Sequence, residues 1–227
     1  MKFKIFGGGA SAVLTFADNF HRTDQPSMLG DAWICAPGAG STIVGGSNLA
    51  ASINVAGGSQ ATFSICSSNG ANVIYCWPIP LTWNILNALQ QEAQCRYISD
   101  NSGGVNGAFN GPFVLGNVNK DSCYFIETNA NAAGSLVVGD WIVVARKGGV
   151  HTTLAGPFTF ALNDTLRIEG IPSATGTTVN AYKNGVRQSS TVDSAAGFLS
   201  TGVCGFFDFF VSTTITQGID NFTCGNF

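Results

Sequence analysis

The sequence predicts an all-β protein in which two antiparallel sheets pack as a sandwich. Short apolar segments follow one another along the chain, with turn residues between them at regular spacing. The alternation of strands and helices that marks parallel sheets is absent. In addition, the tripeptide Asp18-Asn19-Phe20 returns near the end of the chain as Asp220-Asn221-Phe222. We therefore expect the first and last strands to lie side by side and to close one domain.

The composition fits one large domain with a nearly uncharged surface. The chain has 227 residues, a length that a single sandwich can reach, and 45% of them are hydrophobic. Only 10% are charged, against a usual share of about 25%. A surface so poor in charge favours a protein that packs against other subunits or works outside the cell. The net charge of −3 and the scattered basic residues argue against a nucleic-acid partner.

Neither a membrane span nor a zinc site is predicted. No apolar run approaches the roughly 18 residues that a membrane helix needs. The seven cysteines form no CxxC pair and have no histidine at a ligand spacing. We favour buried thiols over a disulfide framework, although the sequence leaves both open. The cysteines are Cys35, Cys66, Cys76, Cys95, Cys123, Cys204 and Cys224.

The first residues are expected to form an extended arm, 1–11, outside a sandwich of residues 12–227. Lys2, Lys4 and the apolar residues after them are similar to a secretory signal, but Gly7-Gly8-Gly9 interrupts the apolar stretch. Free termini of this composition normally fray, so we expect neighbouring molecules to hold the arm.

The first half of the sandwich should contain a hairpin. Asn69-Gly70 suits the positive φ angles of a tight turn, and it lies between two apolar segments. The strands expected in this half are 12–16, 32–36, 41–56, 61–66 and 72–77, with the last two forming the hairpin.

One helix is predicted, inside an insertion at about 78–111. It follows two prolines, and Thr82 can cap its start. We expect it to cover one opening of the sandwich, in preference to acting as a recognition element. The residues that form its apolar stripe are Trp83, Leu86, Leu89, Ala93 and Tyr97.

The second half of the chain returns to strands. Its clearest local signal is Asn184-Gly185, which predicts a tight turn between two alternating segments. The expected strands are 112–115, 122–127, 135–145, 150–154, 157–161, 165–171, 177–182, 186–191, 202–211 and 213–222.

The order of several short motifs resembles the concanavalin A-like, laminin G-like jelly roll over about residues 13–224. The resemblance implies a jelly-roll sandwich. Such folds occur in lectins, in carbohydrate-processing enzymes and in structural proteins of bacterial viruses, so the fold alone does not select a function. The matching residues are Asp18 to Phe20, Leu29, Gly30, Trp33, Asp164 to Glu169, Val179 to Gly185, Gly202, Gly205, Phe206 and Asp220 to Phe222.

No catalytic residue is predicted from the carboxylates. Glycoside hydrolases with this fold resemble one another in a Glu-X-Asp-X-(X)-Glu strand, which places an acid and a nucleophile about 5 Å apart. Here Glu92, Glu127 and Glu169 have no second carboxylate at that spacing. Asp208 is likewise alone among four phenylalanines. We therefore expect no enzymatic activity.

A nucleophilic triad also lacks support. The only histidines are His21 and His151, and no Gly-X-Ser-X-Gly elbow occurs. His21 is expected to be solvated or at an interface. A pairing of Cys123 or Cys204 with His151 stays open, because sequence cannot place these side chains.

The sequence offers candidates for two kinds of ligand, calcium and a sugar. Asp18, Asp24 and Asp220 are weak candidates for calcium, because they would converge if the chain ends pair. Their alternative role, bonding to the backbone of turns, is favoured, and no cofactor is expected. Trp77 and Trp83 are candidates for stacking on a sugar ring, whereas Trp141 lies in an apolar run and is expected in the core.

These observations favour a non-enzymatic structural protein of a bacteriophage virion. We expect a capsid decoration or cement protein that is made in the host cytoplasm and placed on the capsid surface. Its partners would be the major capsid protein and copies of itself, with no nucleic acid and no membrane. The alternative is a carbohydrate-binding, lectin-like module, either a tail or fibre adhesin or a secreted lectin.

Overall fold

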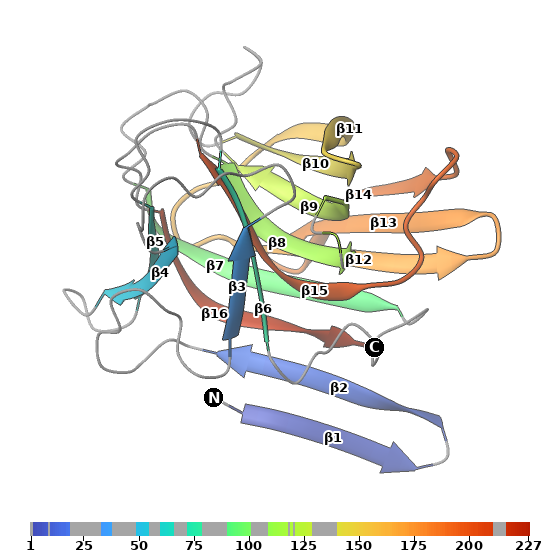
Figure 1. The fold of residues 1–227 in the computed structure, drawn as a ribbon, viewed down its shortest axis with the longest axis horizontal. Helices are drawn as coiled ribbons and strands as arrows, with labels where there is room; N and C mark the ends of the chain where they lie inside the picture. Colours follow the sequence, from blue (N-terminus) through green and yellow to red (C-terminus); the bar gives the residue numbers. More distant parts are fainter. Residues whose placement is uncertain are drawn as a thin grey trace.

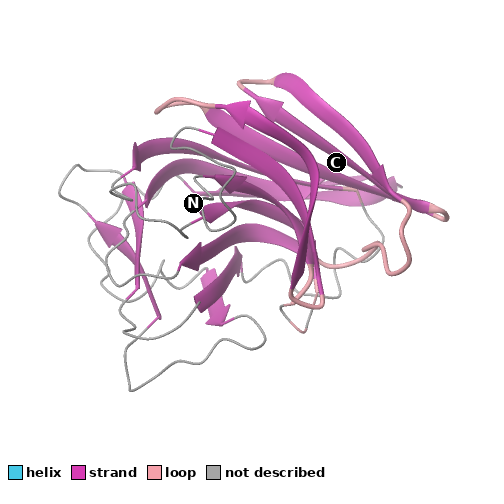
Figure 2. Ribbon diagram, turned by 90° about the horizontal axis from the view of Figure 1, so that it is seen from above, coloured by secondary structure: helices cyan, strands magenta, loops and turns pink. Residues whose placement is uncertain are grey.

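The computed structural model contains two antiparallel sheets packed face to face (Figure 1). In the residues that it describes there are sixteen strands and no helix. Figure 2 shows these strands from above, with loops between them. The prediction of an all-β, two-sheet sandwich is therefore confirmed. Within the same residues, no helix long and apolar enough to cross a membrane is found. The described residues are 2–8, 10–18, 33–37, 49–54, 60–65, 72–78, 90–100, 109–117, 119, 121–128, 140–210 and 217–227.

The smaller sheet has seven strands in the order β11-β10-β9-β8-β15-β6-β3. Every neighbouring pair is antiparallel. Its strands are β3 (Trp33–Pro37), β6 (Asn72–Pro78), β8 (Phe109–Gly116), β9 (Cys123–Thr128), β10 (Asp140–Lys147), β11 (Val150–Thr159) and β15 (Val203–Phe210).

The larger sheet has nine strands, seven of them in the order β1-β2-β16-β7-β12-β13-β14. The other two, β4 and β5, pair with each other, and β5 also pairs with β16. Its strands are β1 (Lys2–Gly8), β2 (Ala10–Asp18), β4 (Leu49–Asn54), β5 (Gln60–Ile65), β7 (Gln91–Asp100), β12 (Thr165–Ser173), β13 (Gly176–Lys183), β14 (Val186–Asp193) and β16 (Gln217–Asn226).

The two ends of the chain lie side by side, as the repeated tripeptide predicts. Strands β2 and β16 are antiparallel, with Asp18 opposite Phe222 and Phe16 opposite Cys224 (Figure 1). All four of these residues are at most 2% exposed. Phe20 lies outside the described residues. The seam between the first and last parts of the chain is therefore a ladder of backbone hydrogen bonds with a buried face.

The core lies between the two sheets and draws on both. Alternate residues of each strand point inward, which buries one face of each sheet. Trp141 is fully buried, as its apolar surroundings in the sequence predict. The aromatic side chains buried in this core are Phe16, Tyr97, Tyr124, Trp141, Phe206 and Phe222.

The helix prediction is wrong for residues 91–97. This segment is β7, in which Ala93, Cys95 and Tyr97 are buried and the residues between them are half-exposed. A spacing of four residues fits a strand as well as a helix, because four is an even number. The spacing from Ala93 to Tyr97 therefore could not distinguish the two. The earlier part of the predicted helix, 79–89, lies outside the described residues.

Strand β7 also carries a buried polar side chain between the sheets. Gln91 is fully buried. Its Nε2 donates to the carbonyl oxygen of Gly202, at 2.7 Å, and its Oε1 accepts from the backbone N–H of Leu115, at 3.0 Å. The segment expected as an insertion, 78–111, thus supplies β7 to one sheet and the start of β8 to the other.

The hairpin predicted around Asn69-Gly70 is wrong. Strand β5 pairs with β4 and β16 in the larger sheet, whereas β6 pairs with β3 and β15 in the smaller one. The two strands were correctly placed in the sequence, but the link between them crosses from sheet to sheet. A turn signal fixes only local backbone angles, and it does not select the partner of a strand.

The boundary expected at the end of the arm falls inside strand β2. Residues 2–8 form β1, which pairs with β2 from Lys2 opposite Ala17 to Gly8 opposite Ala10. The segment 1–11 thus contributes an edge strand to the larger sheet (Figure 1).

The Asn-Gly turn of the second half is confirmed. Asn184 and Gly185 have φ angles of 51° and 80°, and they join β13 to β14. The Asn184 side chain also accepts a hydrogen bond from the backbone N–H of Thr165, at 2.8 Å. This contact attaches the turn to the start of β12.

The seam can be tested with Phe222→Ala. This change removes a fully buried ring, and such truncations cost about 3–5 kcal/mol of unfolding free energy. Phe227→Ala is the matched control, because Phe227 is 47% exposed; it should stay within about 0.5 kcal/mol of wild type. Urea unfolding measures both, and equal losses would contradict the proposed seam.

Candidate functional site

The candidate site lies on the face of the smaller sheet that points away from the core. In β9, Tyr124 and Ile126 belong to the core. The alternate residues Cys123, Phe125 and Glu127 therefore face outward. Strands β10 and β11 add two basic side chains to this face. We call the group of Phe125, Glu127, Arg146 and His151 the outward cluster.

The contacts of the outward cluster indicate which ring nitrogen of neutral His151 carries the proton. Arg146 donates from its guanidinium to Nε2 of His151, at 2.8 Å. Since an arginine can only donate, Nε2 must be an acceptor, and the ring proton of neutral His151 sits on Nδ1. Nδ1 lies 3.6 Å from Oε2 of Glu127. The edge of the histidine ring meets Phe125, with ring centroids 5.4 Å apart.

The charged groups of the outward cluster are largely buried. Glu127 and Arg146 are 7% and 6% exposed, whereas the side chain of His151 is 27% exposed. The guanidinium and the carboxylate lie on opposite sides of the same imidazole, 2.8 Å from Nε2 and 3.6 Å from Nδ1. The only member of the cluster that presents a sizeable surface to solvent is therefore the histidine ring.

The outward cluster does not form a nucleophile and base. Cys123 is opposite Arg146 across the β9–β10 ladder, and Arg146 is opposite His151 across the β10–β11 ladder. Arg146 thus stands between the thiol and the imidazole. It also occupies the histidine nitrogen that would have to accept the thiol proton. The pairing of Cys123 with His151 that the sequence left open does not arise here.

The outward cluster also lacks the carboxylate pair of a retaining glycosidase. The positions two and four residues before Glu127 on the same face are Phe125 and Cys123, both fully buried. The residue opposite Glu127 on β10 is Ile142. An acid and a nucleophile about 5 Å apart cannot be built from these residues. Among the residues whose side chains are described, no group of three or more metal-ligating residues occurs either.

A second polar cluster lies on the outer face of the larger sheet, and its side chains bond to one another. Glu169 accepts from Arg167 (3.1 Å), from the Tyr182 hydroxyl (2.7 Å) and from the Asn180 amide (3.1 Å). Arg167 donates in addition to Glu92, at 3.0 Å, and lies 4.0 Å from the centre of the Tyr182 ring. Burial, together with the bond to Glu169, raises the pKa of Tyr182. Both oxygens of Glu169 are thus already bonded.

A third polar cluster joins the two sheets at one end of the sandwich. Tyr124 of β9 donates to Asp193 at the end of β14, at 2.6 Å. Lys147 of β10 lies 2.7 Å from the same carboxylate, and the backbone N–H of Leu199 donates to the Tyr124 hydroxyl, at 3.0 Å. Burial opposes ionisation of Asp193, but the bonds from Lys147 and Tyr124 outweigh it and lower its pKa.

The structure places only part of the residues proposed for ligands. Asp18 is 2% exposed at the seam. Trp77 belongs to β6, but its side chain, like that of Asp220, lies outside the described residues. Asp24 and Trp83 lie outside them altogether. Calcium binding and sugar stacking therefore remain predictions.

The sequence did not reveal the outward cluster. In the sequence, His151 has only Cys123 or Cys204 as a possible partner, Glu127 has no second carboxylate at a catalytic spacing, and no pattern points to Arg146. Three neighbouring strands bring them together, and the pairing of β9, β10 and β11 is invisible in a linear pattern. The available signal was the alternation of β9, which places Glu127 on the face opposite Tyr124 and Ile126.

Comparison with solved structures shows the fold. The chain is similar to an endo-1,3-β-glucanase from Streptomyces sioyaensis, with a TM-score of 0.55 and 12% identity over 92% of this chain and 95% of that one. It is also similar to a galectin-like-fold protein of unknown function from Bacillus subtilis, with a TM-score of 0.54 and 10% identity over 99% and 98%. The β-glucanase of Bacillus licheniformis gives a TM-score of 0.53 and 10% identity over 94% and 98%.

The chain thus has a concanavalin A-like, galectin-like jelly-roll fold, and this part of the resemblance is confirmed. No family model and no curated protein sequence matches the chain. At 10–12% identity the structural likeness extends to the fold and not to the activity.

The third polar cluster gives a prediction for the pH dependence of stability. Because the folded-state pKa of Asp193 is lowered, its stabilising effect is complete above the unfolded pKa of about 3.9 and is lost as the pH falls through the folded pKa. Asp193→Asn should therefore cost about 1–3 kcal/mol at neutral pH. The difference from wild type should shrink in acid.

Urea unfolding of both proteins at neutral and acid pH measures this difference. Asp140→Asn, a change at a half-buried aspartate at the start of β10, is the matched control and should show a smaller loss at neutral pH. A cost for Asp193→Asn that stays constant down to low pH would show that the carboxylate charge is unimportant.

Proposed function

We propose that this protein is a non-enzymatic structural protein of a bacteriophage virion, a capsid decoration or cement protein. The observation that carries the non-enzymatic part is the state of its ionisable groups. Both oxygens of Glu169 accept hydrogen bonds, and Glu127 is 7% exposed beside the imidazole of His151. A catalytic acid or base needs a free position facing a substrate, which Glu169 lacks, and burial leaves Glu127 little surface to offer one.

The composition supports a position within an assembly. A lone soluble protein usually depends on surface charge to stay dispersed. With 10% charged residues and 29 glycines, this chain is better suited to a surface that neighbouring subunits cover. In this proposal it binds the major capsid protein and copies of itself on the outside of the capsid, after synthesis in the host cytoplasm.

The sandwich would act as a rigid block between neighbours. Tyr124, Lys147 and Asp193 join its two sheets at one end, and Gln91 joins them in the interior. Edge strand β1 and the strand beside it, β2, lie at one margin of the larger sheet. Edge strands offer backbone groups that can pair with another chain, and we propose that this margin contributes to lattice contacts.

Particle fractionation tests the virion assignment. Phage particles from the source culture are separated on a density gradient, and each fraction is analysed by mass spectrometry for this chain and the major capsid protein. We expect the two to migrate together at a constant ratio. Particles from a strain that lacks the gene should lose their genome at a lower temperature. Recovery of the chain only at the top of the gradient would contradict the proposal.

A carbohydrate-binding module is the second candidate. It is favoured by the jelly-roll fold and by His151, the one member of the outward cluster whose side chain is partly exposed, at 27%. A hydrolase built on the same cluster would be a third outcome, which the burial of Glu127, at 7% exposed, argues against.

A glycan array and a hydrolysis assay separate these candidates. The virion proposal expects no glycan bound at millimolar affinity or tighter, and no reducing ends released from β-1,3-glucan. Binding that His151→Ala or Trp83→Ala abolishes, while the Phe227→Ala protein keeps it, would establish the lectin-like function. Hydrolysis that Glu127→Gln abolishes would instead establish an enzyme.

A further inference from the structure

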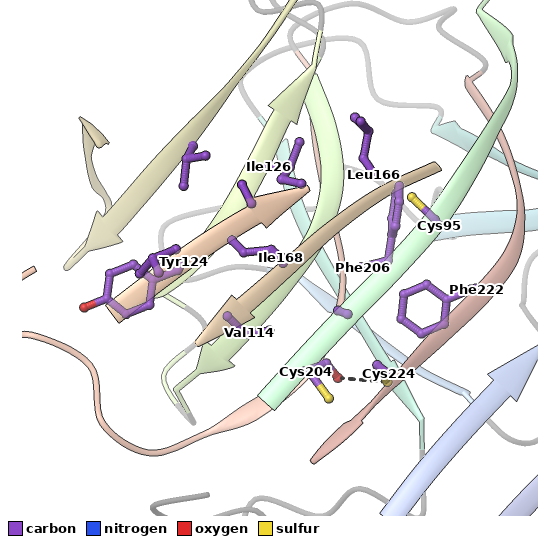
Figure 3. Packing of buried hydrophobic residues seen from close by; sticks show 14 of the residues in the cluster. Cys95, Val114, Tyr124, Ile126, Leu166, Ile168, Cys204, Phe206, Phe222 and Cys224 are labelled. Carbon is purple, nitrogen blue, oxygen red and sulfur yellow. Dashed lines mark hydrogen bonds between the residues drawn. The ribbon is translucent and has the colours of Figure 1, made fainter. Parts of the chain in front are cut away.

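Two buried thiols face each other across the core of the sandwich. Cys204 lies on β15 of the smaller sheet and Cys224 lies on β16 of the larger one. They are 0% and 1% exposed. Figure 3 shows their side chains between the two layers, joined by the contact of Cys224 with the Cys204 carbonyl.

The contacts of each sulfur show how closely the strands approach here. Sγ of Cys224 lies 3.8 Å from the carbonyl oxygen of Cys204. In return, Sγ of Cys204 lies 3.9 Å from the carbonyl oxygen of Gly225. Each sulfur therefore touches the backbone of the strand that carries the other. Packed sheets are ordinarily about 10 Å apart, a distance that a disulfide cannot span without backbone movement.

Small residues explain the close approach. Cys204 is followed by Gly205 and Cys224 by Gly225, all four of them buried. Ala93 lies opposite Cys224 on the neighbouring strand β7. With no large side chain at these positions, the two backbones come near enough for the thiols to meet.

We propose that Cys204 and Cys224 form a disulfide that links the two sheets under oxidising conditions. Each thiol gives up one proton and one electron, and a sulfur–sulfur bond forms between them. A small-molecule disulfide is the oxidant, and it accepts both electrons and both protons to become two thiols. The cross-link stands on the core geometry and does not depend on the proposed virion function.

The reaction should be slow at neutral pH. The thiolate is the attacking species, and burial together with the neighbouring Cys204 thiol raises the pKa of Cys224. The oxidant must also reach the pair through a transient opening of the sandwich. The rate of cross-linking should therefore increase as the pH is raised.

The other buried cysteines provide matched controls. Cys95 lies on β7, two residues along the strand from Ala93, the partner of Cys224. Figure 3 labels it in the same core. Cys123 faces outward from β9. Both are fully buried, so they match the pair in burial but not in position.

Mass spectrometry of the wild-type protein tests the cross-link directly. The folded protein is incubated with oxidised or reduced glutathione, then unfolded, and its free thiols are alkylated. Trypsin cleaves after Arg187, and the peptide 188–227 contains Cys204 and Cys224 and no other cysteine. After oxidation we expect this peptide to carry no alkyl group. Its mass should be two hydrogen atoms lower than that of the same peptide with two free thiols. Chymotrypsin, cutting among Phe206 to Phe210, should then give two fragments that only a reductant separates.

Variants and thermal unfolding complete the test. Cys95→Ala and Cys123→Ala should keep the cross-link, whereas Cys224→Ala should abolish it. Closing a loop of this length should raise the melting temperature of the oxidised wild type by about 5–10 °C. Two alkyl groups on peptide 188–227 after prolonged oxidation of the wild type, or a bond from either cysteine to Cys95, would overturn the proposal.

Discussion

The pairing of β16 with its neighbours is the interaction on which the rest of this sandwich depends. β16 lies between β2 and β7 and also pairs with β5, so the last described strand joins segments from the start and the middle of the chain. Because these contacts are far apart in sequence, their formation must overcome a large loss of chain entropy. The buried side chains Phe222 and Cys224 offset that cost by removing apolar surface from water.

Several buried polar side chains in the described part of the chain hold the two sheets together. Gln91 and the cluster of Tyr124, Lys147 and Asp193 each bond one sheet to the other. Buried polar groups must find partners, and such partners exist only when both sheets are in their final positions. These contacts therefore favour one relative placement of the sheets, which a uniformly apolar core would specify less well.

The errors of the sequence-based prediction have specific causes. Ala93 and Tyr97 fit a helical stripe and a strand face equally well. Side chains four residues apart lie on the same face of a helix, and also on the same face of a strand, whose side chains repeat every two residues. The composition of Asn69-Gly70 is typical of a tight turn, but such a pair says nothing about which sheet each flanking strand enters. Asn184-Gly185 succeeded because both of its strands do belong to the same sheet, so that the local turn and the long-range pairing agree.

By itself, the sequence determined the fold class, the position of most strands, the β13–β14 turn and the proximity of the two chain ends. These properties follow from the alternation of apolar residues, from turn chemistry and from a repeated motif, all of which can be read directly from the sequence. Only the tertiary structure decided which strands are neighbours. Those neighbours bring Glu127 close to His151 and Arg146, and Cys204 close to Cys224. Such contacts join residues from different strands or different sheets. Their distances depend on register and on the spacing of the layers, which no linear pattern contains.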